Sequence, residues 1–190
     1  MHRSKLDAWI LASFLALPAC TGGDSQAGGT TTRKYVFITS LAYTGNLGGL
    51  AGADKTCATL AASAGHAGAW VAWLSDESTD ALDRIADVGP WYAMGSTTLV
   101  AATKSAFAYT PAASVARDQN GAGTSNVHAM WSGTQTGGTR VVGHTCKSWT
   151  DGTNASTGQQ TKELGGGTGG WFPDARGPCY MLMPLACIQQ

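Results

Sequence analysis

The cysteines limit what this chain can fold into more than any other feature. Four of the five lie between residues 57 and 187: Cys57, Cys146, Cys179 and Cys187. An even number of cysteines in an exported chain indicates disulfide bonds. Four cysteines allow three pairings, and spacing alone selects none of them. The alternative is a zinc site completed by His128 or His144, but no two of these cysteines have the spacing of about two to four residues that zinc knuckles use.

Residues 1–19 predict a secretory signal. Basic residues precede an apolar run of about ten residues, whereas a helix that crosses a bilayer needs about twenty. The run ends at LPAC, which resembles the bacterial lipobox, in which a small residue precedes the cysteine that becomes the lipid-bearing first residue. We therefore expect Cys20 to be lipidated. Ordinary cleavage that leaves Cys20 free, and hence a secreted protein, is the alternative.

Residues 20–34 predict a flexible tether between the lipidated cysteine and the domain. Glycine, serine and threonine dominate this stretch, which cannot bury enough apolar surface to order itself. Residues 35–190 are enough for one domain with its own core. The chain has 12 Lys and Arg against 12 Asp and Glu, so it lacks the basic surface that holds nucleic acid or anionic lipid. We expect no nucleic-acid partner, and membrane contact through the lipid anchor only.

The apolar pattern of the first half predicts strands around one main helix. Residues 35–39 are β-branched and aromatic, and residues 69–75 are rich in tryptophan, so both indicate strands. The alanine-rich stretch 50–64, followed by Gly65, predicts a helix with Cys57 on its buried side. GPWYAMGSTTLVA predicts a hairpin that turns at Gly95-Ser96.

The remaining elements are marked by weaker patterns. DESTDALDRIAD, residues 76–87, predicts a short helix with a solvated acidic face. Further strands are expected near residues 129–132, 140–142, 145–149 and 180–187. Residues 151–170 are rich in glycine and predict a long loop region, and loops of that length in compact domains are usually functional or mobile. Together these elements predict an α+β domain and not a doubly wound sheet.

The glycines of TGNLGGLAGADKTC, residues 44–57, raise the question of a nucleotide site. Their spacing matches neither G-x-G-x-x-G nor the P-loop pattern. The chain also lacks the repeated strand and helix units of nucleotide-binding folds. We therefore expect these glycines to shape a turn, and we expect no cofactor.

Several stretches carry a resemblance to a known family: VFITSLAYTGNLGGLAGADKTC, AWLSD, GPWY and CYMLMPLAC. Over residues 35–190 the chain resembles a bacterial extracellular domain family of unknown function, related to endostatin and to C-type lectin-like domains. The resemblance implies mixed antiparallel sheets, one main and one short helix, long loops and two disulfides. It implies an outer disulfide between Cys57 and Cys187 and an inner one between Cys146 and Cys179.

The resemblance carries no metal site to this chain. Sugar-binding C-type lectins have a Glu-Pro-Asn or Gln-Pro-Asp loop and a Trp-Asn-Asp sequence, and neither occurs here. The histidines and the basic face that serve endostatin for zinc and heparin are also missing. We therefore expect no metal ligands and no calcium-dependent sugar site of the usual kind.

The sequence is therefore expected to encode a lectin-like binding or adhesion module of the bacterial cell envelope, on the outer membrane or cell surface. Its expected partner is an extracellular glycan or protein. Aromatic rings with nearby amide and carboxylate groups suit sugars, which makes these the candidate ligand-binding residues: Trp149, Asp151, Asn154 and Trp171.

Two other functions compete with binding. One is a structural envelope protein with no small ligand. The other is an enzyme on a lectin-like fold, in which Cys146 would be a nucleophile served by His144, provided that its thiol is free. Neither G-x-S-x-G nor H-E-x-x-H occurs, so we expect no catalytic residues.

Overall fold

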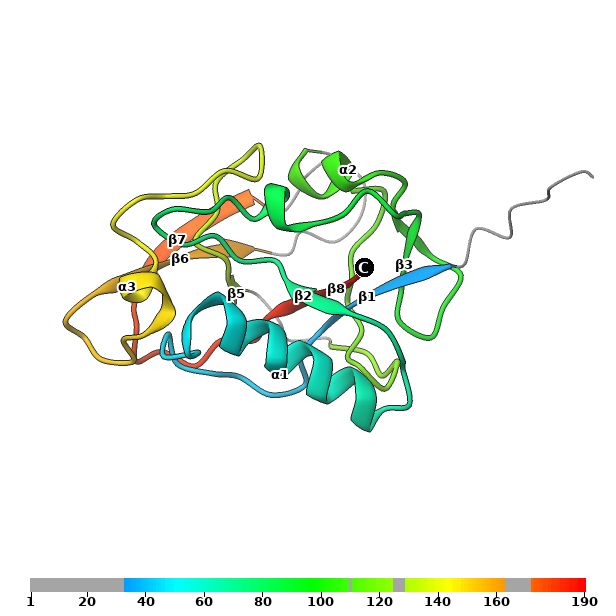
Figure 1. The fold of residues 1–190 in the computed structure, drawn as a ribbon, viewed down its shortest axis with the longest axis horizontal. Helices are drawn as coiled ribbons and strands as arrows, with labels where there is room; N and C mark the ends of the chain where they lie inside the picture. Colours follow the sequence, from blue (N-terminus) through cyan, green and yellow to red (C-terminus); the bar gives the residue numbers. More distant parts are fainter. Residues whose placement is uncertain (1–32, 110, 125–128, 163–171) are drawn as a thin grey trace, which may run out of the picture. The chain divides into compact units, whose positions relative to one another are not determined.

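Two β-sheets form the framework of the domain (Figure 1). The computed structural model describes residues 33–109, 111–124, 129–162 and 172–190, which belong to one compact unit, Thr32–Gln190. The larger sheet contains β1 (Lys34–Ile38), β2 (Trp70–Ala72), β3 (Trp91–Ala93), β4 (Leu99–Ala101) and β8 (Ala186–Gln189). The smaller sheet contains β5 (Met130–Trp131), β6 (Thr157–Lys162) and β7 (Phe172–Pro178). With few helices and two disulfides, the domain is α+β, as predicted.

The larger sheet has the order β2-β8-β1-β3-β4, which places the first and last strands side by side at its centre. β1 pairs antiparallel with β8, with Val36 opposite Ile188, and parallel with β3, with Tyr35 opposite Tyr92. Val36, Phe37 and Ile38 are all fully buried although their side chains alternate between faces. Both faces of this sheet are therefore covered.

The helix α1 (Gly49–Ser63) covers one face of the larger sheet, close to β2 (Figure 1). Its buried residues are Ala53, Cys57 and Ala61, which recur every four residues and so share one helical face. Their small side chains allow the helix to approach the sheet closely. The prediction of a helix over 50–64 is confirmed, and Gly65 follows it with a φ of +83°.

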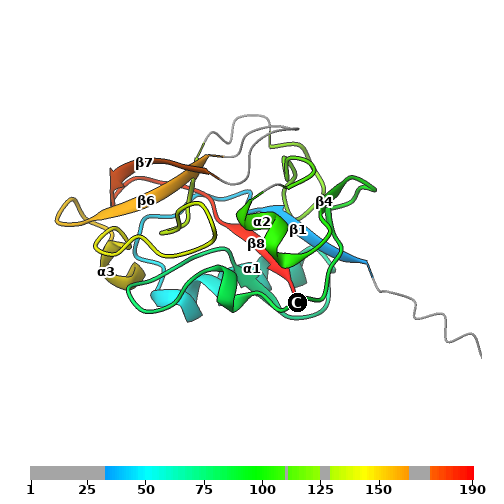
Figure 2. The same cartoon turned by 90° about the horizontal axis from the view of Figure 1, so that it is seen from above.

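Aromatic rings fill the other face. Trp91 and Phe107 lie 5.2 Å apart, and Trp73 and Phe107 lie 6.0 Å apart, between ring centroids. The 3₁₀ turn η1 (Leu82–Arg84) and the short helix α2 (Lys104–Ala108) contact each other, and α2 also contacts β4. Figure 2 shows the smaller sheet at the end of the domain away from β4.

Several sequence predictions need correction. The hairpin at residues 91–101 is present as β3 and β4, but the expected short helix is only η1, and α2 was not expected. The strand predicted near 180–187 begins only at Ala186, and the one predicted near 140–142 is a single bridge between Thr134 and Arg140. Pro184 interrupts a regular ladder before β8 because it lacks an N–H donor.

The largest differences lie between residues 145 and 162. The expected strand at 145–149 is instead α3 (Cys146–Trp149), a single turn whose residues all have positive φ. β6 lies inside the stretch predicted as a loop, because its polar sequence, TGQQTK, conceals a buried strand. Gln159, Gln160 and Thr161 are buried there, and the Gln159 Nε2 amide donates to the carbonyls of Gln160 and Ala175.

Candidate functional site

Trp149 belongs to the core. It has 0% exposure, its ring centroid lies 5.9 Å from that of Trp131, and its Nε1 donates to the carbonyl of Ser75 at 2.7 Å. A buried indole whose only donor is already used offers no face to a ligand. The expectation that Trp149 forms an aromatic platform is therefore corrected: its ring supports the loops from inside.

Asp151 is also occupied within the protein. Its carboxylate accepts hydrogen bonds from Thr153 N, Thr153 Oγ1 and Ser156 Oγ at 2.7–2.9 Å. The bonds from Ser156 and Thr153 hold the pKa of this carboxyl well below its usual range. Asn154 is exposed on the same loop, whereas Trp171 lies outside the described residues. The four predicted ligand residues are thus not brought together as one described site.

The disulfides have the pairing that the family resemblance implied. Cys57 is bonded to Cys187, and Cys146 is bonded to Cys179. His144 Nδ1 lies 2.7 Å from Thr157 Oγ1, so His144 contacts a hydroxyl and not a thiol. Burial and the nearby Arg176 charge lower the pKa of His144. Among the described residues, no group of three or more His, Cys, Asp or Glu side chains is placed to hold a metal ion.

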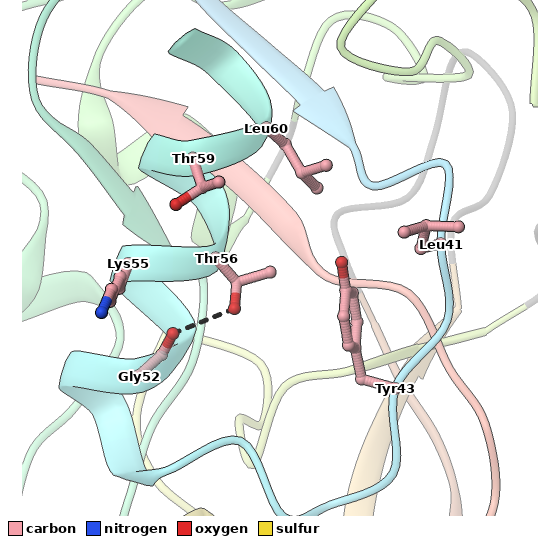
Figure 3. Close-up of a pocket in the computed structure, with 7 residues that line it drawn as sticks. All are labelled: Leu41, Tyr43, Gly52, Lys55, Thr56, Thr59 and Leu60. Carbon is pink, nitrogen blue, oxygen red and sulfur yellow. Dashed lines mark hydrogen bonds between the residues drawn. The ribbon is translucent and has the colours of Figure 1, made fainter. Parts of the chain in front are cut away.

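A surface hollow of about 370 Å³ lies beside α1 (Figure 3). Leu41 and Tyr43 stand across from α1, with the hollow between them and the helix. Leu41 is 57% exposed, so its apolar side chain is accessible from solvent. The remaining lining residues come from α1: Gly52, Lys55, Thr56, Thr59 and Leu60.

Long-range pairing positions the wall formed by Leu41 and Tyr43. After β1 the chain runs alongside the segment that leads into β8. Two backbone hydrogen bonds join these segments: Thr39 N donates to Leu185 O, and Tyr43 N donates to Met183 O, each at 2.8 Å. Gly52 lets the loop before α1 approach the helix closely, because a Cβ at this position would collide with the carbonyl oxygen of Leu47. The wall and the helix are therefore both fixed by backbone contacts.

The hollow combines apolar surface with unused polar groups. Leu41, Leu60 and the Tyr43 ring supply the apolar part, and burial raises the pKa of the Tyr43 hydroxyl. Within the described part of the chain, Tyr43 Oη, Thr59 Oγ1 and Lys55 Nζ have no hydrogen-bond or ion-pair partner. Such groups can bind the polar groups of a ligand that packs on the apolar wall.

Sequence reasoning missed this hollow. Thr56, Thr59 and Leu60 share a face of the predicted helix at spacings of three and four residues, which was the available signal. The opposite wall, Leu41 and Tyr43, is positioned because the backbone of residues 39–43 pairs with residues 183–185, which are far away in sequence. The glycine-rich stretch does form the turn that was predicted, since Gly48 and Gly49 have φ values of +77° and +76° immediately before and at the start of α1.

No family model and no curated protein matches this sequence. Within the described residues, every helix is too short or too polar to cross a lipid bilayer.

Proposed function

We propose that this chain is an exported, lipid-anchored binding module of the bacterial cell envelope, with a fold of the C-type lectin-like and endostatin-related class. In this proposal it recognises a glycan or a protein through the hollow beside α1, without the usual calcium-dependent sugar site. The hollow replaces the set of Trp149, Asp151, Asn154 and Trp171 as the candidate ligand site, because Trp149 and Asp151 are committed to the protein interior.

The disulfides and the central strands support the fold class. One disulfide joins the first helix to the last strand, and the other joins the turn before β6 to the residue after β7. This is the arrangement implied by the resemblance over residues 35–190. The antiparallel pairing of β1 with β8 brings the two ends of the domain to the same sheet, which suits a module attached by one end.

Export and anchoring rest on the N-terminal sequence. The apolar run, the LPAC sequence and the glycine-rich tether are what an envelope lipoprotein requires. A multiply acylated Cys20 would hold the protein at the membrane, because each buried methylene contributes about 0.8 kcal/mol. The tether of about fourteen residues would let the domain reach ligands beyond the membrane surface.

The single observation that carries ligand binding is the composition of the hollow. Leu41 and the Tyr43 ring form an apolar wall, and the facing helix supplies Leu60, a hydroxyl group and an ammonium group, the last two without a partner among the described residues. Its volume of about 370 Å³ lies at the lower end of the range of about 300–1,000 Å³ that small-molecule sites occupy. One or two sugar rings, or one or two protein side chains, would fill it.

The test blocks the hollow without removing a core contact. Thr59→Arg places a long side chain over the hollow, and the helix tolerates it because arginine has a higher helix propensity than threonine. Thr136→Arg is the matched control, since Thr136 is exposed in a turn on another part of the domain and the charge change is the same.

Binding would be measured on a glycan array and by pulldown from envelope extracts, each with calcium and with EDTA. We expect binding that survives EDTA, is lost in Thr59→Arg and persists in Thr136→Arg. A wild-type protein that is silent in both assays would favour the structural envelope role. Binding that both variants retain would place the ligand site elsewhere.

A further inference from the structure

Four consecutive residues, none of them glycine, form a left-handed turn. Cys146, Lys147, Ser148 and Trp149 have φ values of 50°, 52°, 53° and 63°. L-residues enter this region at a steric cost, and they normally do so singly and not in succession. The turn is therefore a conformation that its own residues do not favour, and contacts from outside must hold it.

The contacts that hold the turn lie at its two ends. Cys146 is bonded covalently to Cys179, and the Trp149 ring is fixed in the core by Trp131 and by the carbonyl of Ser75. Within the turn, Trp149 N donates to Thr145 O at 2.7 Å and Ser148 N donates to Thr145 Oγ1 at 3.2 Å. Among these contacts, the Cys146–Cys179 disulfide is the covalent one.

The turn and its disulfide also hold the segment that leads into α1. Gly45 N donates to Cys179 O at 2.7 Å, and Leu47 N donates to Trp149 O at 2.9 Å. Asn46 forms an antiparallel bridge with Thr150. The segment 45–47 is thus bonded to both sides of the Cys146–Cys179 link, and it lies two residues after Tyr43 in the wall of the hollow.

We propose that the Cys146–Cys179 disulfide is a redox-sensitive lock on this turn and on the segment 45–47. A dithiol reductant cleaves the S–S bond, transfers two electrons and two protons to give two cysteine thiols, and is itself oxidised to a disulfide. The released turn relaxes towards right-handed or extended backbone, and residues 45–47 lose their partners. The further consequence, weaker binding in the hollow, rests on the proposed function, whereas the conformational change does not.

The location of the two disulfides indicates which one reacts first. Cys57 lies in the middle of α1 and Cys187 in the central strand β8, so exposing that pair requires the sheet and helix to separate. Cys146 is followed by Lys147, whose side chain is 65% exposed, and Cys179 is followed by Tyr180, which is 57% exposed. All four cysteines are buried, so reaction needs local opening, which is easier at a strained surface turn than in the central sheet.

The test is limited reduction with dithiothreitol under native conditions, followed by iodoacetamide and peptide mapping. Labelling at Cys146 and Cys179 is expected to be at least about tenfold faster than at Cys57 and Cys187. In the half-reduced protein, hydrogen exchange at residues 145–150 and 45–47 should rise, while α1 and β8 stay protected. Simultaneous labelling of all four cysteines, earlier labelling of Cys57, or unchanged exchange at 145–150 would overturn the proposal.

A variant pair gives a second measurement. Cys146→Ala with Cys179→Ala should reproduce the raised exchange at 145–150 and 45–47, whereas Cys57→Ala with Cys187→Ala should raise exchange across the whole domain. If the variant Cys146→Ala with Cys179→Ala does not fold, hydrogen exchange in the half-reduced wild-type protein still tests the proposal. Because these readouts use no ligand, they can succeed even if the glycan-array and pulldown experiments refute the proposed binding function.

Discussion

Replacing Arg84 by methionine is expected to lower the free energy of unfolding by about 3 kcal/mol, near the lower end for a broken buried ion pair. The Arg84 guanidinium joins three parts of the fold. It donates to both carboxylate oxygens of Asp54 on α1 at 2.6 and 2.7 Å, and to the carbonyls of Ala72 and Leu74 at 2.7 and 2.8 Å. Methionine keeps much of the aliphatic volume and removes every one of these bonds.

The magnitude follows from the exposure of the two partners. The Arg84 side chain is 10% exposed and that of Asp54 is 31% exposed. Losing one member of a buried pair costs about 3–5 kcal/mol, because the other charge stays behind without its partner. Because Asp54 is partly solvated, we expect the loss in the free energy of unfolding to lie at the lower end of this range. Removing both charges in Asp54→Asn with Arg84→Met should cost less than Arg84→Met alone, since no unpaired carboxylate remains.

Urea unfolding of the oxidised protein measures this effect. With a slope of about 1–3 kcal/mol per molar urea, a loss of about 3 kcal/mol moves the midpoint down by about 1–3 M. Arg140→Met is the matched control, because Arg140 pairs with Asp80 but its side chain is 39% exposed, and such pairs contribute about 1 kcal/mol or less. Equal losses in the two variants would refute the reasoning.

Two further outcomes are expected. Gly45→Ala should lower the free energy of unfolding by about 1–3 kcal/mol, because a Cβ at this position would lie 2.7 Å from Cys146 Cβ and 2.8 Å from Asp151 O. Gly123→Ala is the control: a Cβ there has no atom within 4 Å, so the free energy of unfolding should change by less than about 0.5 kcal/mol. Urea midpoints that fall equally in the two variants would contradict this expectation. Because its pKa is depressed in the folded state, the ionised Asp151 stabilises the fold above the unfolded pKa of about 4 and loses this effect as pH falls through the lower folded pKa. Wild type should therefore exceed Asp151→Asn in thermal stability at pH 7, and the gap should shrink below pH 4; a gap independent of pH would show that the carboxylate charge is not involved.

The sequence predicted those elements whose local pattern agrees with their burial. The helix α1 has small residues at every fourth position, and the hairpin of β3 and β4 turns at Met94-Gly95, one residue before the predicted turn, so both elements were found. In each case propensity and tertiary packing favour the same conformation.

The missed elements are those in which tertiary contacts override local preference. β6 looks like a loop because Gln159 and Gln160 are polar, yet both are buried: Gln159 Nε2 donates to the carbonyls of Gln160 and Ala175, and the Gln160 amide contacts Met181 Sδ. The turn at 146–149 is left-handed because a disulfide and a buried indole hold it, and no local rule predicts four such residues in succession. Trp149 was taken for a surface residue for the same reason.

The candidate site was less accessible to sequence reasoning than the fold. The hollow needs the chain after β1 to lie against the segment before β8, a contact between residues about 140 positions apart. The α1 residues that line it look like an ordinary solvated helix face when the sequence is considered alone. Only the three-dimensional arrangement adds Leu41 and Tyr43 to them.

The most direct test is mass spectrometry of the full-length protein isolated from the cells that express it, with free thiols blocked before digestion. We expect an N-terminal peptide that starts at an acylated Cys20, together with Cys57–Cys187 and Cys146–Cys179 as linked peptides. An unprocessed Met1 peptide with four alkylated, reduced cysteines would contradict it.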